Sequence, residues 1–227
     1  MEQRNYRYFD VIMASFVAVL MISNIVSTKI VALFGMKLLT FDGGTIIFPI
    51  SYIFGDILTE VYGYAKSRRV IWVGFGCLIM MSIIVFIVGK MEPAPDWKLQ
   101  RSYEDILMYT PRTVAASIIA FFVGEFANSF VLSKMKIWTQ GRFLWTRTIG
   151  STLVGQLLDT FFFVLIAFYG RLPASLVANV IIANYIFKTS FEIVATPVTY
   201  RVVGWLKRQE QEDHYDYGEN YNVFTWR

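Results

Sequence analysis

Apolar runs long enough to cross a membrane recur along the whole sequence, and this feature constrains the fold most strongly. A hydrocarbon layer about 30 Å thick is crossed by about 20 apolar residues in a helix. A β-barrel would instead show alternating segments of about ten residues, which this sequence lacks. Of the 227 residues, 56% are hydrophobic and only 17% are charged, whereas soluble domains carry about 25% charged residues. The sequence therefore predicts an all-α integral membrane protein, a bundle of about six transmembrane helices.

Six segments have the composition of membrane spans, and a shorter apolar segment lies between the first two. The predicted spans cover residues 8–28, 44–62, 70–89, 113–133, 148–169 and 175–203. The segment between the first two is too short to span and is interrupted at Gly35 and Met36. It is better suited to a short hairpin or a re-entrant piece packed against the bundle. We expect one six-helix transmembrane domain over residues 1–208 and a polar tail over 209–227, solvated and partly disordered.

Basic residues in the connections between the spans predict the orientation. With the N-terminus in the cytoplasm, 13 of the 21 Lys and Arg residues lie on the cytoplasmic side and seven on the outer side, with Lys188 inside the membrane. This bias predicts that both termini, and with them the polar tail, are cytoplasmic.

Several classes of chemistry are disfavoured by residues and motifs that the sequence lacks. A single cysteine, Cys77, excludes a disulfide framework within the chain and a Cys-based metal site, and the one histidine, His214, lies in the polar tail. No P-loop, HExxH or GxSxG motif is present. The net charge of +4 follows membrane topology rather than nucleic-acid binding. We expect no metal, no cofactor, no nucleic-acid partner and no enzymatic activity.

Ionisable residues inside the predicted spans are the candidates for function. They are Asp56, Glu60, Glu125, Asp159, Lys188 and Glu192. Each ionised group at mid-membrane costs about 2.5–3.5 kcal/mol on insertion scales. Five carboxylates and one ammonium cannot all remain charged in a low dielectric, so some must be protonated, meet a cation or substrate, or open to water. This pattern predicts a transport site for a small solute.

Residue spacing leaves the role of Glu60 open. Asp56 and Glu60 are four residues apart and share one face of the second predicted span. Asp56 lies near the middle of that span, where a structural role is less expected. Glu60 either joins the site or sits at the cytoplasmic rim and pairs with Arg68 or Arg69.

The last two spans also carry polar residues at helical spacing. Gln156 and Asp159 are three apart on one face of the fifth span. Lys188 and Glu192 are four apart on the sixth, where they either neutralise each other along the helix or contribute separately to a site. The fifth span also carries Phe163 on the face of Asp159, one of the aromatic residues placed to stack on a flat ligand.

Amide and proline residues complete the predicted site. Asn24 near the end of the first span and Asn128 beside Glu125 in the fourth can each make several hydrogen bonds to a ligand. Pro49 and Pro197 lie inside the second and sixth spans, and helices broken by proline near a central polar site are a recurring device of transporters.

The motif from Asp56 to Gly63, D-I-L-T-E-V-Y-G, resembles the queuosine precursor transporter family, which is also grouped as vitamin uptake transporters. The preceding segments S-N-I-V-S-T-K and F-P-I-S-Y-I-F-G fit the same family. Further matching positions are Arg68, Arg69, Asn128, Arg147, Ser151, Gln156, Asp159, Thr160, Lys188, Glu192 and Pro197. The resemblance covers nearly the whole chain up to about Arg208.

The resemblance implies a carrier in the bacterial inner membrane that imports 7-deazaguanine bases such as 7-cyano-7-deazaguanine. A guanine-like edge offers two parallel donors that one carboxylate can accept, for which Asp159 or Asp56 is expected first and Glu192 next. The expected substrate-binding residues are Asn24, Asp56, Asn128, Gln156, Asp159, Lys188 and Glu192. The residues expected in coupling or in structural roles are Glu60, Glu125 and Arg147.

Alternative functions stay open at this point. A proton-coupled secondary transporter, a binding subunit that needs a separate ATPase, and a carrier of another small planar metabolite or vitamin all fit the pattern. A membrane enzyme using Asp56 and Glu60 as an acid–base pair is a further alternative. The expected partners are the small-molecule substrate and the lipid bilayer, and a homodimer is one of the oligomeric states left open.

Overall fold

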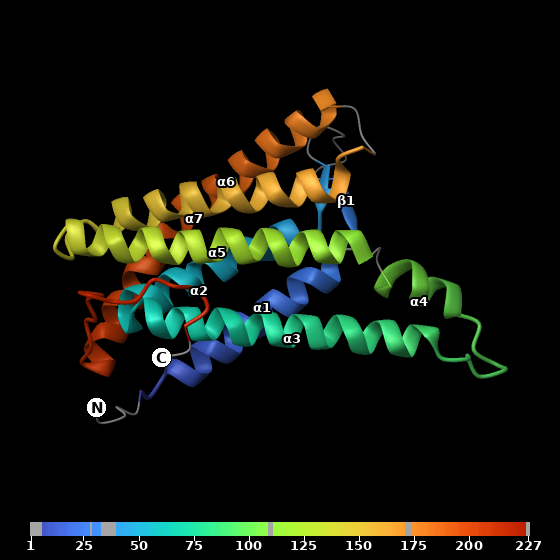
Figure 1. The fold of residues 1–227 in the computed structure, drawn as a ribbon, viewed down its shortest axis with the longest axis horizontal. Helices are drawn as coiled ribbons and strands as arrows, with labels where there is room; N and C mark the ends of the chain where they lie inside the picture. Colours follow the sequence, from blue (N-terminus) through green and yellow to red (C-terminus); the bar gives the residue numbers. More distant parts are fainter. Residues whose placement is uncertain (1–5, 28, 33–39, 109–110, 171–173, 226–227) are drawn as a thin grey trace.

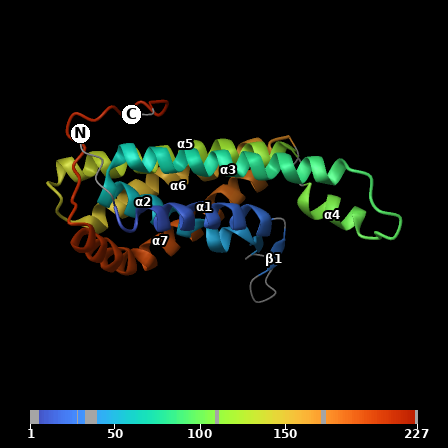
Figure 2. The ribbon, with the colours of Figure 1, turned by 90° about the horizontal axis from the view of Figure 1, so that it is seen from below.

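Six long helices lie lengthwise beside one another in the computed structural model, and a short helix extends from one end (Figures 1 and 2). The structure describes residues 6–27, 29–32, 40–108, 111–170 and 174–225. The helices are α1 (Phe9–Val26), α2 (Gly44–Tyr62), α3 (Tyr64–Lys90), α4 (Gln100–Leu107), α5 (Pro111–Trp138), α6 (Leu144–Phe168) and α7 (Ala174–Glu210). Among the described residues, five helices are long and apolar enough to cross a membrane, namely α1, α2, α3, α5 and α6. The predicted all-α membrane class is therefore confirmed.

Two short strands join α1 to α2. Strand β1 (Ile30–Ala32) pairs antiparallel with β2 (Thr40–Asp42), which corresponds to the hairpin expected between the first two spans. The backbone N–H of Gly43 donates to the carbonyl of Lys29 at 2.7 Å. The interruption expected at Gly35 and Met36 lies outside the described residues.

Several helices extend beyond the predicted spans. Helix α3 begins at Tyr64 rather than near residue 70, and α7 ends at Glu210 rather than near 203. Hydropathy identifies the part of a helix in hydrocarbon, whereas backbone hydrogen bonding continues the helix into the polar region. Only Gly63 separates α2 from α3. Its φ of +88° suits glycine, and an added Cβ would lie 2.9 Å from the Asp216 carboxylate.

Helix α2 is the centre of the bundle and contacts α1, α3, α5 and α7. Nearly all of its residues from Ser51 to Tyr62 are buried, including Asp56 and Glu60. A helix with these polar groups is excluded from lipid and packs inside its neighbours. Pro49 lies inside α2 and Pro197 inside α7, and both helices continue through the proline. The helix breaks considered at these prolines are therefore absent from the described residues.

The outer helices turn apolar side chains outward. Ile79, Met80, Ile83, Ile84 and Ile87 of α3 are all exposed, as expected of a helix face that contacts lipid. The polar groups of the bundle lie on its inner side and not on this face of α3.

Glycine residues bring α5 and α6 into close contact. An added Cβ on Gly124 would lie 2.7 Å from the Cβ of Asp159, and one on Gly155 would lie 2.8 Å from the Cβ of Asn128. Small residues allow membrane helices to approach in this way. The close approach places Asp159 of α6 directly against α5.

Helix α1 begins and α7 ends at the same end of the bundle, which we call the terminal end, while the strands and α4 lie at the opposite, strand end (Figure 1). Residues 211–225 run over the terminal end along α3 (Figure 2). Arg68 Nη1 donates to the carbonyls of Asn220 and Asn222 at 2.6 and 3.0 Å, and Trp72 Nε1 donates to the carbonyl of Val223 at 2.8 Å. This packed course differs from the solvated, partly disordered tail expected from composition, because buried donors of α3 hold the tail backbone.

Candidate functional site

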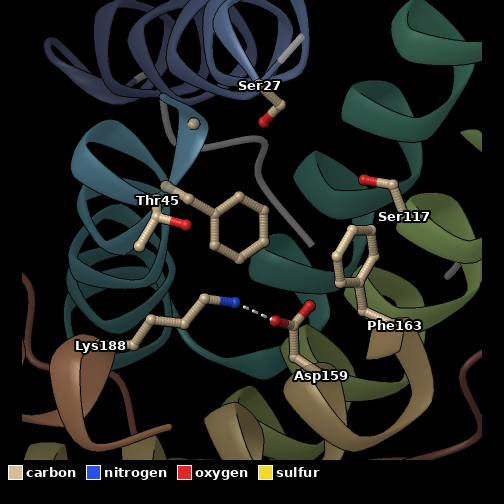
Figure 3. Close-up of a pocket in the computed structure, with 8 residues that line it drawn as sticks. Ser27, Thr45, Ser117, Asp159, Phe163 and Lys188 are labelled. Atoms are coloured by element: carbon tan, nitrogen blue, oxygen red, sulfur yellow. Dashed lines mark hydrogen bonds and ion pairs between the residues drawn. The ribbon is translucent and has the colours of Figure 1, made fainter. Parts of the chain in front are cut away.

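A pocket lies between five helices near the strand end (Figure 3). The space between its walls is about 350 Å³ when the open solvent at its mouth is counted. Its lining residues are Ser27, Gly44, Thr45, Phe48, Ser117, Asp159, Phe163 and Lys188. They come from α2, α5, α6, α7 and the residue that follows α1, so the pocket depends on the packing of the whole bundle.

An ion pair from two helices forms one wall of the pocket. Lys188 Nζ of α7 lies 2.6 Å from Asp159 Oδ2 of α6, and both side chains are buried to 90% or more. The same ammonium lies 4.6 Å from the ring centroid of Phe48, a favourable cation–π distance. The side chains of Phe163 and Ser117 lie on the opposite side of the space in Figure 3. A ligand here meets a donor, an acceptor and aromatic surface together.

Asn24 lies behind this pocket rather than in its lining. Its Oδ1 accepts a hydrogen bond from Ser117 Oγ at 3.1 Å, and its Nδ2 donates to the carbonyl of Leu20 at 3.0 Å. The side chain therefore orients Ser117, which itself lines the pocket.

A second group of polar residues lies deeper in the bundle, one to two helical turns from the pocket toward the terminal end. This inner cluster consists of Asp56, Glu125, Asn128, Gln156 and Glu192, all of them fully buried. Asn128 Nδ2 donates to Asp56 Oδ1 at 2.8 Å. Within the described part of the chain, both carboxylate oxygens of Glu125 and of Glu192 and both polar side-chain atoms of Gln156 have no hydrogen-bond partner.

The carboxylates of the inner cluster are close enough to interact electrostatically. Glu125 interacts with Asp159 and Glu192, and Asp56 interacts with Glu192 and Glu125. Among the described groups that face them, the one cation is Lys188, which is bound to Asp159. An uncompensated buried charge costs several kcal/mol. The inner cluster therefore cannot hold all of its carboxylates ionised.

A third group closes the terminal end and has the opposite charge balance. This terminal network consists of Glu60, Lys136, Arg147, Lys207 and Asp213. Glu60 is bound by the Arg147 guanidinium and by Lys207 Nζ at 2.6 Å, with Lys136 Nζ at 3.6 Å. Asp213 lies 2.7 Å from Lys136 and 2.8 Å from Lys207.

The environment of Asp213, which follows α7, shifts its pKa. Partial burial raises the pKa of this carboxyl, but hydrogen bonds from Lys136 and Lys207 outweigh burial and hold the pKa below its ordinary value. Asp213 is therefore an acceptor that remains ionised at neutral pH, and it links the tail to the helix ends.

Two of the alternatives left open by spacing are resolved by these contacts. The pairing of Glu60 with Arg68 or Arg69 is wrong: Glu60 is fully buried, Arg68 binds the tail, and Arg69 is exposed. The turn at Gly63 directs the start of α3 away from Glu60. The pairing of Lys188 with Glu192 along α7 is also wrong, because Lys188 binds Asp159 across the helix interface.

The structure divides the predicted site residues among the three regions. Asp159 and Lys188 lie in the pocket, while Asp56, Glu125, Asn128, Gln156 and Glu192 form the inner cluster, and Glu60 and Arg147 belong to the terminal network. The pocket residues Phe48, Thr45 and Ser117 were not identified from the sequence. Phe48 lies two turns before Asp56 on the same helix, a signal that could have found it, whereas Thr45 and Ser117 resemble ordinary helix-packing residues.

Within the described ranges, no group of three or more His, Cys, Asp or Glu side chains is arranged to hold a metal ion. The three regions instead combine carboxylates with amides, lysines and arginines. These side chains are suited to hydrogen bonding and ion pairing.

Comparison with known proteins places the chain among membrane transporters. Residues 42–202 match the family described as "Putative vitamin uptake transporter". The chain is 32% identical over 190 residues to the probable queuosine precursor transporter of Bacillus subtilis, covering 83% of this chain and 82% of that protein. It is 25% identical over 155 residues to the queuosine precursor transporter of Escherichia coli, covering 66% and 67% of the two chains. No solved structure gives a significant match.

Proposed function

The chain belongs to the vitamin uptake transporter family, and on that premise we propose that it imports queuosine precursors, with 7-deazaguanine bases such as 7-cyano-7-deazaguanine as the substrate class. It is a multi-pass membrane transporter rather than an enzyme. The names of its relatives support the substrate class, and the chemistry of the pocket supports it independently.

The observation that carries the proposal is the Asp159–Lys188 pair beside aromatic surface in the membrane-embedded pocket. A 2-amino-4-oxo pyrimidine edge presents two adjacent N–H donors and a carbonyl acceptor. A carboxylate accepts the two donors and an ammonium donates to the carbonyl. The substrate edge would thus replace the contacts that Asp159 and Lys188 make with each other, while Phe48 and Phe163 contact the ring.

Access to the pocket fits an import carrier in the bacterial inner membrane. With both termini in the cytoplasm, as the distribution of basic residues predicts, the strand end faces outward. The pocket then opens toward the outside, and the terminal network and the tail close the cytoplasmic side. Import would require the opposite arrangement, in which the strand end closes and the terminal network opens.

We propose further that a proton gradient drives the import. The inner cluster has more carboxylates than cations, and such groups cannot remain ionised in a dry interior. Protonation of buried carboxylates is a recurring means of coupling in membrane carriers.

The test is uptake of labelled 7-cyano-7-deazaguanine by cells that neither make nor import queuosine precursors. The wild-type chain should restore accumulation, and Asp159→Asn and Lys188→Gln should abolish it while both variants still reach the membrane. Glu92→Gln, in an exposed connection, is the matched control and should retain uptake. Normal uptake by both pocket variants would contradict the proposed site, and no uptake by the wild-type chain would contradict the substrate.

A binding panel distinguishes queuosine precursors from other vitamins or planar metabolites. Ligands that have the guanine-like edge should stabilise the detergent-purified protein against thermal unfolding. We expect 7-deazaguanines to bind and 7-deazaadenine not to bind. Stabilisation by a vitamin that lacks this edge, with none by 7-deazaguanines, would contradict the proposed substrate class and indicate a vitamin carrier instead.

A further inference from the structure

Glu125 and Glu192 of the inner cluster have no hydrogen-bond partner among the residues that the structure describes, although each has two hydrogen-bonding oxygens. We infer that Glu125 and Glu192 are the groups that carry the coupled protons, binding them together with the substrate and releasing them on the opposite side. The inference rests on the proposed transport function and assigns a site and residues to its proton coupling.

The first step concerns charge. From α2, Asp56 and the Tyr52 hydroxyl face these glutamates; from α6, Asp159 faces them; and from α7, Lys188 precedes Glu192 by one turn. Lys188 is already paired with Asp159 at 2.6 Å. Two ionised glutamates would add two uncompensated charges beside a third carboxylate, so the conformation described here favours the protonated form of both.

The second step concerns hydrogen-bond acceptors. Among the described residues, Gln156 Oε1, Asn128 Oδ1 and all four carboxylate oxygens of the two glutamates are buried without a donor, whereas the unpaired amide nitrogen of the cluster is Gln156 Nε2. Unpaired acceptors therefore outnumber unpaired amide donors, and a protonated carboxyl group supplies an O–H donor. Protons on Glu125 and Glu192 would reduce this excess of acceptors.

The third step concerns space. The Glu125 carboxylate lies directly against the Cα of Gly55, where even an added Cβ would overlap it. This packing leaves no room beside Gly55 for a hydrated cation, while a proton needs none. Glu60 of the terminal network differs in its partners, since three cationic side chains already pair with it. We therefore do not assign a coupled proton to Glu60.

The position of the two glutamates fits the inferred role. Glu192 follows Lys188 by four residues on α7, which is about 6 Å along the helix axis. The glutamates thus lie between the pocket and the terminal network. A rearrangement that closes the strand end and opens the terminal end would therefore change the side from which the substrate and the two glutamates are accessible in one step.

The experiment uses purified full-length protein in liposomes, with labelled 7-cyano-7-deazaguanine and an imposed pH gradient. A gradient of one pH unit supports about tenfold accumulation for each coupled proton. The wild-type chain should accumulate substrate to this extent. Glu125→Gln and Glu192→Gln, which imitate the protonated state, should each lower the accumulation about tenfold by removing one coupled proton. The double variant should exchange labelled for unlabelled substrate but show no accumulation, and Glu92→Gln should behave as wild type.

A second measurement follows substrate binding in detergent as a function of pH. Wild-type affinity should fall as pH rises, because protons and substrate bind together. The affinity of each single variant should depend on pH less steeply, and that of the double variant should not depend on pH. A flat profile in the double variant supports the inference even if that variant no longer exchanges. A wild-type profile in the variants, or gradient-driven accumulation by the double variant, overturns it.

The controls separate this inference from the proposed function. Exchange by the wild-type chain with no response to the pH gradient would overturn the proton site and leave the transport function intact. Absence of both exchange and binding by the wild-type chain would instead contradict the proposed substrate, and with it the inference that rests on it.

Discussion

The inner cluster and the terminal network are both buried, both contain glutamate, and both involve α2. In the terminal network, Glu60 is surrounded by Arg147, Lys207 and Lys136. In the inner cluster, Glu125 and Glu192 have no hydrogen-bond partner among the described residues, and Lys188, one turn from Glu192, is already paired with Asp159. The charges of the terminal network neutralise one another and hold helix ends together. The inner cluster instead contains buried groups without partners, which lowers stability. The comparison shows that the partners of a buried glutamate differ with its place in the bundle, and on the inferred mechanism this difference separates a structural glutamate from one that carries a proton.

Glu60→Gln should give the largest effect on stability and should separate the two regions most clearly. The change leaves three cationic side chains near one another with fewer acceptors, and loss of one partner from a buried ion pair costs about 3–5 kcal/mol. Thermal unfolding of the detergent-purified protein measures the loss. Glu192→Gln should unfold within about 1 kcal/mol of wild type, since it removes no pairing. Equal losses in the two variants would abolish the distinction between the regions.

The Asp159–Lys188 pair lies between the pocket and the inner cluster. Breaking this pair should lower the stability by an intermediate amount. Asp159→Asn alone should cost about 3 kcal/mol, the low end for a buried pair, because this pair lies at a pocket that is open to solvent. Asp159→Asn with Lys188→Met should recover most of that stability and still lack uptake. Measuring unfolding and uptake of the single and double variants checks this, and a double variant as unstable as the sum of the two single variants would contradict direct pairing.

Loosening the packed tail should lower the stability by a smaller amount. The loss would show that residues 211–225 also stabilise the terminal end. Arg68→Gln removes the guanidinium that donates to the carbonyls of Asn220 and Asn222, and we expect a loss of about 1–2 kcal/mol. Limited proteolysis should then cut residues 211–225 faster than in wild type. Arg69→Gln, at the exposed neighbouring position, serves as the control and should leave the cleavage rate unchanged.

The smallest expected effect is a dependence on pH at Asp213. Its pKa lies below the ordinary value in the folded protein, so its contribution to stability is present above that ordinary value and is lost as pH falls through the lowered pKa. Asp213→Asn should therefore unfold at a lower temperature than wild type at neutral pH, with the difference shrinking in acid. Unfolding curves between neutral and strongly acidic pH check this, and a difference that grows in acid would contradict the assigned sign.

The sequence by itself determined the class of the protein and located most of the charged and amide residues that lie inside the bundle. Apolar runs predicted the helices because only a helix satisfies its own backbone within lipid. Charged residues within those runs identified Asp56, Asp159 and Lys188, because a charge in hydrocarbon persists only with a partner or a role. The structure also explains two residues of the D-I-L-T-E-V-Y-G motif. Glu60 belongs to the terminal network, and Gly63 forms the turn between α2 and α3.

Only the tertiary structure decided which of these residues meet. Spacing of four residues suggested Lys188 with Glu192, yet the lysine binds Asp159, because close packing between α6 and α7 offers a nearer carboxylate than the same helix does. The partners of Glu60 come from α5, α6 and α7, and no local pattern connects them. Periodicity shows which residues share a helix face, whereas the rotation and depth of each helix determine what that face meets.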